Sequence, residues 1–150
     1  MIIDKQLLFS TAQAITTVSA VSDNIIDLQN ARDIGVGDNP SLKLFAYVTT
    51  AFLTTNAGTI QVAIQGSTDA TTWTNYALSN STAFTAGTLV AGAHLFDISV
   101  PRPPPGAALP RYLRLNYTLA NAFTAGAITA GLVLDRNDII AYPSGYTVVN

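Results

Sequence analysis

The sequence predicts an all-β protein, a single antiparallel sandwich of about eight strands. Short β-branched and aromatic runs alternate between apolar and polar residues with period two, and Gly, Pro, Asn and Asp separate these runs. All nine acidic residues are Asp, which favours turns, and the helix-favouring Glu is absent. A jelly-roll-like strand order is the first interpretation and an immunoglobulin-like sandwich the alternative, because both produce the same alternation.

Four runs show the alternation most clearly, and each is expected to be a strand with one face in the core. In the first run, Leu44, Ala46 and Val48 fall on one face, while Phe45 and Tyr47 fall on the other. The next three runs divide their side chains in the same way. The four runs are residues 42–52, 59–65, 111–119 and 128–135.

Weaker runs predict the remaining strands, at residues 14–21, 24–28, 72–78 and 95–100. A helical turn within residues 5–14 is a minor alternative at the N-terminus. The chain is expected to form one domain over residues 1–150, with a short N-terminal arm at about 1–10 and a C-terminal tail at about 141–150. Proline removes ladder donors, so the proline-rich segment 101–106 is expected to be an exposed connection between strands.

One pattern, F-T-A-G-x-[LI]-x-A-G, occurs twice, at residues 84–92 and 123–131. Two copies are too few for a repeat architecture, which needs at least three stacked units. We therefore expect the same local structure, a turn followed by a strand, at both places.

Composition indicates an assembling protein. Hydrophobic residues make up 49% of the chain and charged residues 11%, against about 25% charged in average domains. Charged residues are depleted at the cores of protein interfaces, so a weakly charged surface favours assembly. The seven basic residues are scattered and the net charge is −2, which argues against nucleic-acid binding because that needs a clustered positive stripe.

The residue inventory gives little support for catalysis, and no enzyme, metal or cofactor is expected. Cysteine is absent, and His94 is the only histidine. A triad around His94 would use Asp97, which on a strand points to the opposite face. Asp135 and Asp138 form a close carboxylate pair but read as turn residues. No run reaches the 18 apolar residues that would span a bilayer, so no membrane partner is expected.

A hairpin at residues 65–76 offers one alternative function. A strand ends, a Ser-Thr-Asp turn reverses the chain, and Trp73 opens the next strand, with Tyr76 close behind. Similar hairpins occur in galactose-binding-like jelly rolls, where exposed aromatic residues stack on sugars. Trp73 and Tyr76 are therefore candidate glycan contacts, although a tryptophan that packs over the end of the sandwich explains the pattern more simply.

Several sequence blocks, taken together, carry a resemblance to a known family. They are MIIDKQLLFS at residues 1–10, NIIDL at 24–28, RDIGVG at 32–37, RYLRLNY at 111–117, FTAG at 123–126 and AGLVLD at 130–135. With these blocks, the chain resembles the jelly-roll capsid cement, or decoration, proteins of tailed bacteriophages. The proline run and the tail at 142–150 are less typical of that family.

The resemblance implies a structural protein of the virion, made in the cytoplasm of the bacterial host. It implies binding to the outer surface of the phage head at joints between major capsid subunits, which it would stabilise. A homo-oligomer is expected, a dimer first and a trimer second. The chain ends and loops are the expected contacts with the capsid, and the candidate residues are Ile2, Ile3, Lys5, Arg32, Arg102, Pro104, Tyr142 and Tyr146.

Overall fold

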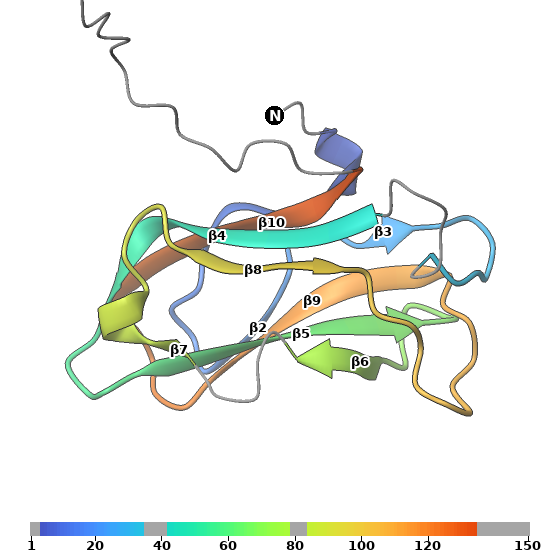
Figure 1. Ribbon diagram of the computed structural model, residues 1–150. Coiled ribbons are helices and arrows are strands. Elements are labelled where there is room, and N and C mark those ends of the chain that lie inside the picture. Colours follow the sequence, from blue (N-terminus) through green and yellow to red (C-terminus); the bar gives the residue numbers. More distant parts are fainter. Residues whose placement is uncertain (1–3, 35–41, 79–83, 135–150) are drawn as a thin grey trace, which may run out of the picture.

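Two antiparallel sheets pack face to face in a computed structural model that describes residues 4–34, 42–78 and 84–134 (Figure 1). The upper sheet in Figure 1 has the order β1 (Leu8–Ala14), β10 (Ala125–Leu134), β4 (Leu42–Leu53) and β8 (His94–Ser99). The lower sheet has the order β2 (Ser19–Val21), β9 (Tyr112–Leu119), β5 (Thr59–Ser67) and β6 (Thr74–Leu78). Two short strands extend the lower sheet: β3 (Ile26–Asp27) pairs with β9, and β7 (Phe84–Thr85) pairs with β5. The all-β sandwich predicted from the sequence is confirmed.

The strand order selects the jelly roll over the immunoglobulin-like alternative. Strand β1 pairs with β10, β2 and β3 pair with β9, β4 pairs with β8, and β5 pairs with β6. These antiparallel pairs are nested along the chain, as in one long hairpin rolled into two layers. That nesting is the jelly-roll arrangement, whereas an immunoglobulin-like sandwich keeps its first two strands in one sheet with the fourth and fifth.

The core lies between the two layers and is built from alternate residues of the long strands. On β9, Leu113, Leu115, Tyr117 and Leu119 are all buried, while the residues between them point outward. The neighbouring strand β5 and the strands β4 and β10 of the opposite sheet contribute aliphatic side chains to the same cluster. Complete burial of one such side chain stabilises the fold by about 1.5–3 kcal/mol.

One polar contact crosses this apolar interior. The hydroxyl groups of Tyr117 on β9 and Ser10 on β1 lie 2.7 Å apart. Burial of the Tyr117 side chain raises the pKa of its phenol above the ordinary value, so the group stays neutral and can donate or accept. The Ser10 hydroxyl donates its one proton to Gln13 Oε1 at 2.6 Å, so the Tyr117 hydroxyl is the donor between the two. The pair therefore ties the edge strand of one sheet to a central strand of the other.

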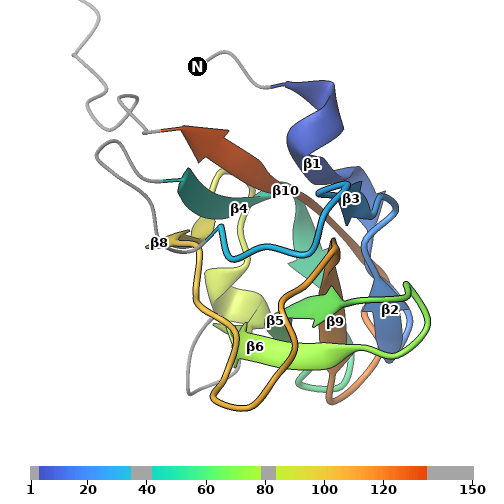
Figure 2. The same cartoon turned by 90° about the vertical axis from the view of Figure 1, so that its right-hand side faces the viewer.

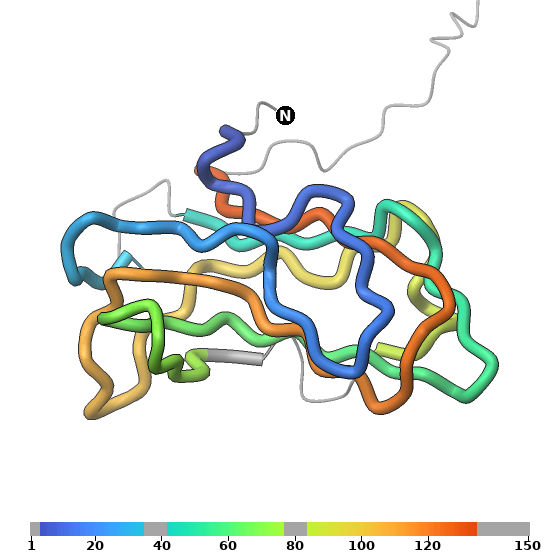
Figure 3. Tube along the Cα trace, turned by 180° about the vertical axis from the view of Figure 1, so that it is seen from behind, coloured from blue at the N-terminus to red at the C-terminus, as the bar shows by residue number. Residues whose placement is uncertain are grey.

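The N-terminal part of the chain differs from the prediction. The 3-10 helix η1 (Lys5–Leu7) is only three residues long, and its first turn is capped by the Asp4 carboxylate, which accepts from the Gln6 amide at 2.9 Å. Residues 8–10, expected in a free arm, belong to β1 because the Phe9 side chain is 0% exposed and fills the core. The segment 14–21, expected as one strand, contains the end of β1, a bend and β2. Figure 3 shows from behind how this blue segment passes from one layer to the other.

The repeated F-T-A-G pattern forms two different structures, which overturns the expectation of one shared solution. In the first copy, Phe84 and Thr85 form β7 and the 3-10 helix η2 (Ala86–Thr88) follows. In the second copy, β10 begins directly at Ala125. Gly126 there has a φ of 147°, and a Cβ on it would lie 2.2 Å from Cδ1 of Phe52, whereas a Cβ on Gly87 would meet nothing within 4 Å. Of Gly87 and Gly126, only Gly126 is required by the fold.

The two glycines provide a matched pair of substitutions. We expect Gly126→Ala to lower the free energy of unfolding by roughly 1–3 kcal/mol, because it collides with the buried Phe52 ring and strains the backbone. Gly87→Ala should change it by less than about 0.5 kcal/mol. Urea denaturation of both variants measures the difference, and equal effects would contradict the assignment.

Candidate docking surface

Four of the seven basic residues lie at one end of the sandwich or on the adjoining part of the lower sheet, although they are scattered in the sequence. At this end the segment after β3 meets the connection between β8 and β9, and Figure 2 looks onto it. The Arg32 amide donates to the Pro110 carbonyl at 3.0 Å, and the Arg102 guanidinium lies 3.9 Å from an Asp33 carboxylate oxygen. The other two are Arg111, in the same connection, and Arg114, on β9.

Arg111 is neutralised within the chain. Its Nε and Nη2 donate to the two carboxylate oxygens of Asp27, each at 3.0 Å. This bidentate pair holds the pKa of Asp27 below its ordinary value and fastens β3 to the start of β9. The Arg111 guanidinium also lies 4.9 Å from the centroid of the Tyr112 ring. Its role is therefore structural.

Arg114 lies at one end of a polar row on the outer face of the lower sheet. Its Nε donates to Gln65 Oε1 at 2.7 Å, and Gln65 Nε2 donates to Asn75 Oδ1 at 2.7 Å. The three residues occupy neighbouring positions on β9, β5 and β6, because Gln65 is in register with both Arg114 and Asn75. One continuous row of directed hydrogen bonds thus crosses three strands.

Trp73 covers the guanidinium of this row. The Cζ atom of Arg114 lies 4.0 Å from the centroid of the Trp73 ring, within the range of a cation–π contact. Burial against the indole and the sheet lowers the pKa of Arg114, although the group remains charged at neutral pH. Trp73 itself is partly buried.

The turn before Trp73 is built by one carboxylate. Asp69 Oδ1 accepts from the amides of Thr71 and Thr72, each at 2.8 Å, and from the Ser67 hydroxyl at 2.9 Å. These hydrogen bonds stabilise the ionised form and hold the pKa of Asp69 well below its usual range. The predicted Ser-Thr-Asp turn therefore fixes the course of the backbone that leads to Trp73.

The two candidate glycan residues do not share a surface. Trp73 lies over Arg114 on the outer face, whereas Tyr76 packs against the hydrophobic core. The Tyr76 hydroxyl occupies the space beneath Gly66, where a Cβ would lie 2.0 Å from it. Burial raises the pKa of Tyr76. The structure therefore does not bring these aromatic residues together as a platform for a sugar.

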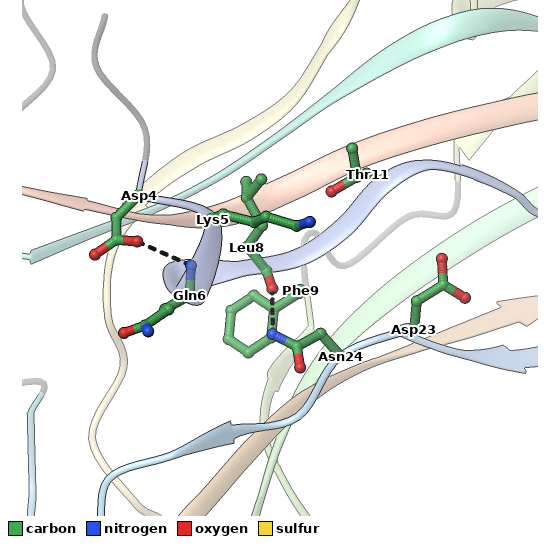
Figure 4. Close-up of a pocket in the computed structure, with 8 residues that line it drawn as sticks. All are labelled: Asp4, Lys5, Gln6, Leu8, Phe9, Thr11, Asp23 and Asn24. Carbon is green, nitrogen blue, oxygen red and sulfur yellow. Dashed lines mark hydrogen bonds between the residues drawn. The ribbon is translucent and has the colours of Figure 1, made fainter.

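A shallow groove beside the N-terminal 3-10 helix contains Lys5, one of the predicted capsid contacts (Figure 4). Phe9 forms its buried floor, and Asn24 Nδ2 donates to the Leu8 carbonyl at 2.9 Å across it. The groove lies on β1 and its neighbouring loop. Its lining residues are Asp4, Lys5, Gln6, Leu8, Phe9, Thr11, Asp23 and Asn24.

The remaining predicted contacts fall into two groups. Arg32, Arg102 and Pro104 lie at the end of the sandwich where the segment after β3 meets the β8–β9 connection. There the Pro104 carbonyl accepts from the Ala107 amide at 3.0 Å. Ile2, Ile3, Tyr142 and Tyr146 lie outside the described residues. Sequence reasoning did not select Arg114 or Gln65, because their pairing depends on strand register.

Within residues 4–34, 42–78 and 84–134, no three His, Cys, Asp or Glu side chains lie close enough to hold a metal ion. In the same ranges, no helix has the length and apolar character needed to cross a membrane. His94 contacts Tyr47, with ring centroids 6.2 Å apart.

Comparison with known proteins identifies the family of this chain. Residues 9–132 match the model of the protein family described as Bbp16, and this range runs from the edge strand β1 almost to the end of β10. The chain belongs to the Bbp16 family. This family is associated with bacteriophages, which agrees with the phage origin predicted from the sequence. A search of curated proteins found no match.

The Asp69 turn gives the Bbp16-family protein a testable acid response. The folded-state pKa of Asp69 is depressed, so its stabilising effect is complete above the unfolded value of about 3.9 and is lost as pH falls through and below it. We expect the melting temperature of the wild type to fall more steeply between about pH 5 and pH 2 than that of Asp69→Asn. Thermal melts followed by circular dichroism test this, and parallel curves would contradict it.

Proposed function

We propose that this protein is a capsid cement protein, which binds the outer surface of a phage head at joints between major capsid subunits and stabilises the shell. The observation that carries the proposal is the match of the whole sandwich to a bacteriophage-associated family. The protein would belong to the virion and have the major capsid protein as its partner.

The surface chemistry supports the proposal. The outer face of β5 and β9 carries mostly amides, hydroxyls and alanine. Ala63, Gln65 and Ser67 on this face are buried within the chain, whereas Gln61, Tyr112, Arg114, Asn116 and Thr118 are at least partly exposed. Such a face can contact another protein widely with little cost of removing charge from water. Many copies on one shell would add weak contacts through effective concentration, and a dimer, or else a trimer, would hold several subunits at once.

The open edges of both sheets offer a second kind of contact. Strand β8 ends the upper sheet and β6 ends the lower sheet, so one side of each strand has no neighbouring strand among the described residues. An extended segment of a partner can add a strand at such an edge, with main-chain hydrogen bonds providing affinity.

The deciding experiment mixes the purified protein with expanded capsid shells that lack it and sediments them together. We expect saturable binding and a higher disruption temperature for decorated shells than for bare shells. An absence of binding would overturn the proposal. Quenching of Trp73 fluorescence by an oligosaccharide, in place of shell binding, would favour a glycan-binding module.

Deletion of Met1–Lys5 tests the expected contribution of the N-terminal arm. The core residue Phe9 and strand β1 remain in the truncated chain, so the melting temperature should stay within about 4–5 °C of the wild type. Occupancy on shells should fall, because Lys5 and the preceding residues are removed. Quantitative gel analysis of sedimented particles measures it, and full occupancy would refute a contact role for the arm.

A further inference from the structure

We propose that the outer face of the lower sheet around Arg114 is a docking surface whose centre receives an acidic side chain of a protein partner. The identity of that partner as the shell protein rests on the proposed function. The inference adds which face of the sandwich meets the shell and which chemical group on the shell it recognises.

The positive charge of Arg114 has no negative partner within the described residues. The two ion pairs there join Arg102 to Asp33 and Arg111 to Asp27. The outward-facing positions of β5 and β9 contribute no carboxylate. A partly buried guanidinium without a counter-charge pays for its removal from water and is stabilised when a carboxylate docks against it.

The free donors of Arg114 have the geometry for that ligand. Gln65 takes the Nε donor at 2.7 Å, which leaves the two Nη atoms without a hydrogen-bond partner among the described residues. Arg114 is only partly buried, and neither Nη atom is among the completely buried polar atoms that lack a partner. Two parallel N–H donors on one planar group match the two oxygens of a carboxylate.

The guanidinium is also fixed before any partner arrives. The Trp73 ring restrains its plane from one side at 4.0 Å, and Gln65 is held in turn by Asn75. A long arginine side chain ordinarily loses rotamer freedom on binding, and this cost is reduced when the side chain is already positioned. Trp and Arg are the residue types that most often dominate interface energies.

The surroundings favour a protein carboxylate over other anions and over sugars. The guanidinium already covers one face of the indole, so that face cannot stack on a sugar ring. A net charge of −2 and the internal pairing of Arg102 and Arg111 weaken any attraction for a phosphate backbone. Asn75, Asn116 and Thr118 on this face are at least partly exposed, uncharged and polar, which suits the rim of a protein interface.

Shell binding by three variants tests the inference. Arg114→Lys keeps the charge but loses the planar donors, and Arg114→Gln loses both. Lys43→Gln removes a positive charge from the other sheet, where Lys43 Nζ donates to Ser99 Oγ at 3.0 Å, and serves as the matched control. We expect both Arg114 variants to bind shells about tenfold or more weakly, and Lys43→Gln to bind within about twofold of the wild type.

Melting curves show whether each variant is folded, and Trp73, the only tryptophan, reports on the docking site through its fluorescence. We expect shells to shift the Trp73 emission of the wild type. If the wild type binds shells and both Arg114→Lys and Arg114→Gln bind them equally well, the inference is overturned and the proposed cement function is retained. Failure of the wild type to bind would overturn both. An equal loss in Lys43→Gln, or an emission shift produced by an oligosaccharide or a nucleic acid instead of shells, would also overturn the inference.

Discussion

The structure depends on one constraint, the burial of a single face of each sheet against the other. The long strand pairs β4–β10 and β5–β9 place aliphatic side chains from both layers into one core. Because successive side chains alternate between faces, this inner requirement decides which positions are left for the outside. The outer residues of β5 and β9 are then free to be amides, hydroxyls and one arginine. The proposed functional surface therefore consists of the positions on these strands that do not face the core.

Period-two patterning was sufficient to locate the long strands. Those expected at 42–52, 59–65, 111–119 and 128–135 are present, with small differences at their ends. The patterning failed where tertiary contacts determine the local structure. Phe9 enters the core from a segment that looked like an arm. Identical F-T-A-G residues form a 3-10 helix in one place and the start of a strand in the other, because only the second packs against Phe52.

The candidate site was less accessible to sequence reasoning than the fold. Gln65 and Arg114 are 49 positions apart, and Asp27 and Arg111 are 84 apart, so only the strand pairing brings them together. The Ser-Thr-Asp turn was recognisable, because its chemistry is local. Positions 73 and 76 would fall on opposite faces of a regular strand, but Trp73 lies before β6 begins and Tyr76 lies at the register shift in the β5–β6 pairing. A search for polar residues at alternate positions on adjacent strands would have identified Gln65 and Arg114 together as candidate site residues.

The nested strand order has a mechanical consequence. Leu8 is paired with Gly131, so the first and last strands of the described chain, the edge strand β1 and its antiparallel neighbour β10, lie side by side. Tension applied between those two points would open the β1–β10 ladder one rung at a time, which is the weak direction of a hydrogen-bonded pair. A load spread over the face of the lower sheet would instead be shared among β9, β5 and β6. A protein of this shape therefore resists force best when it is held by its flat side.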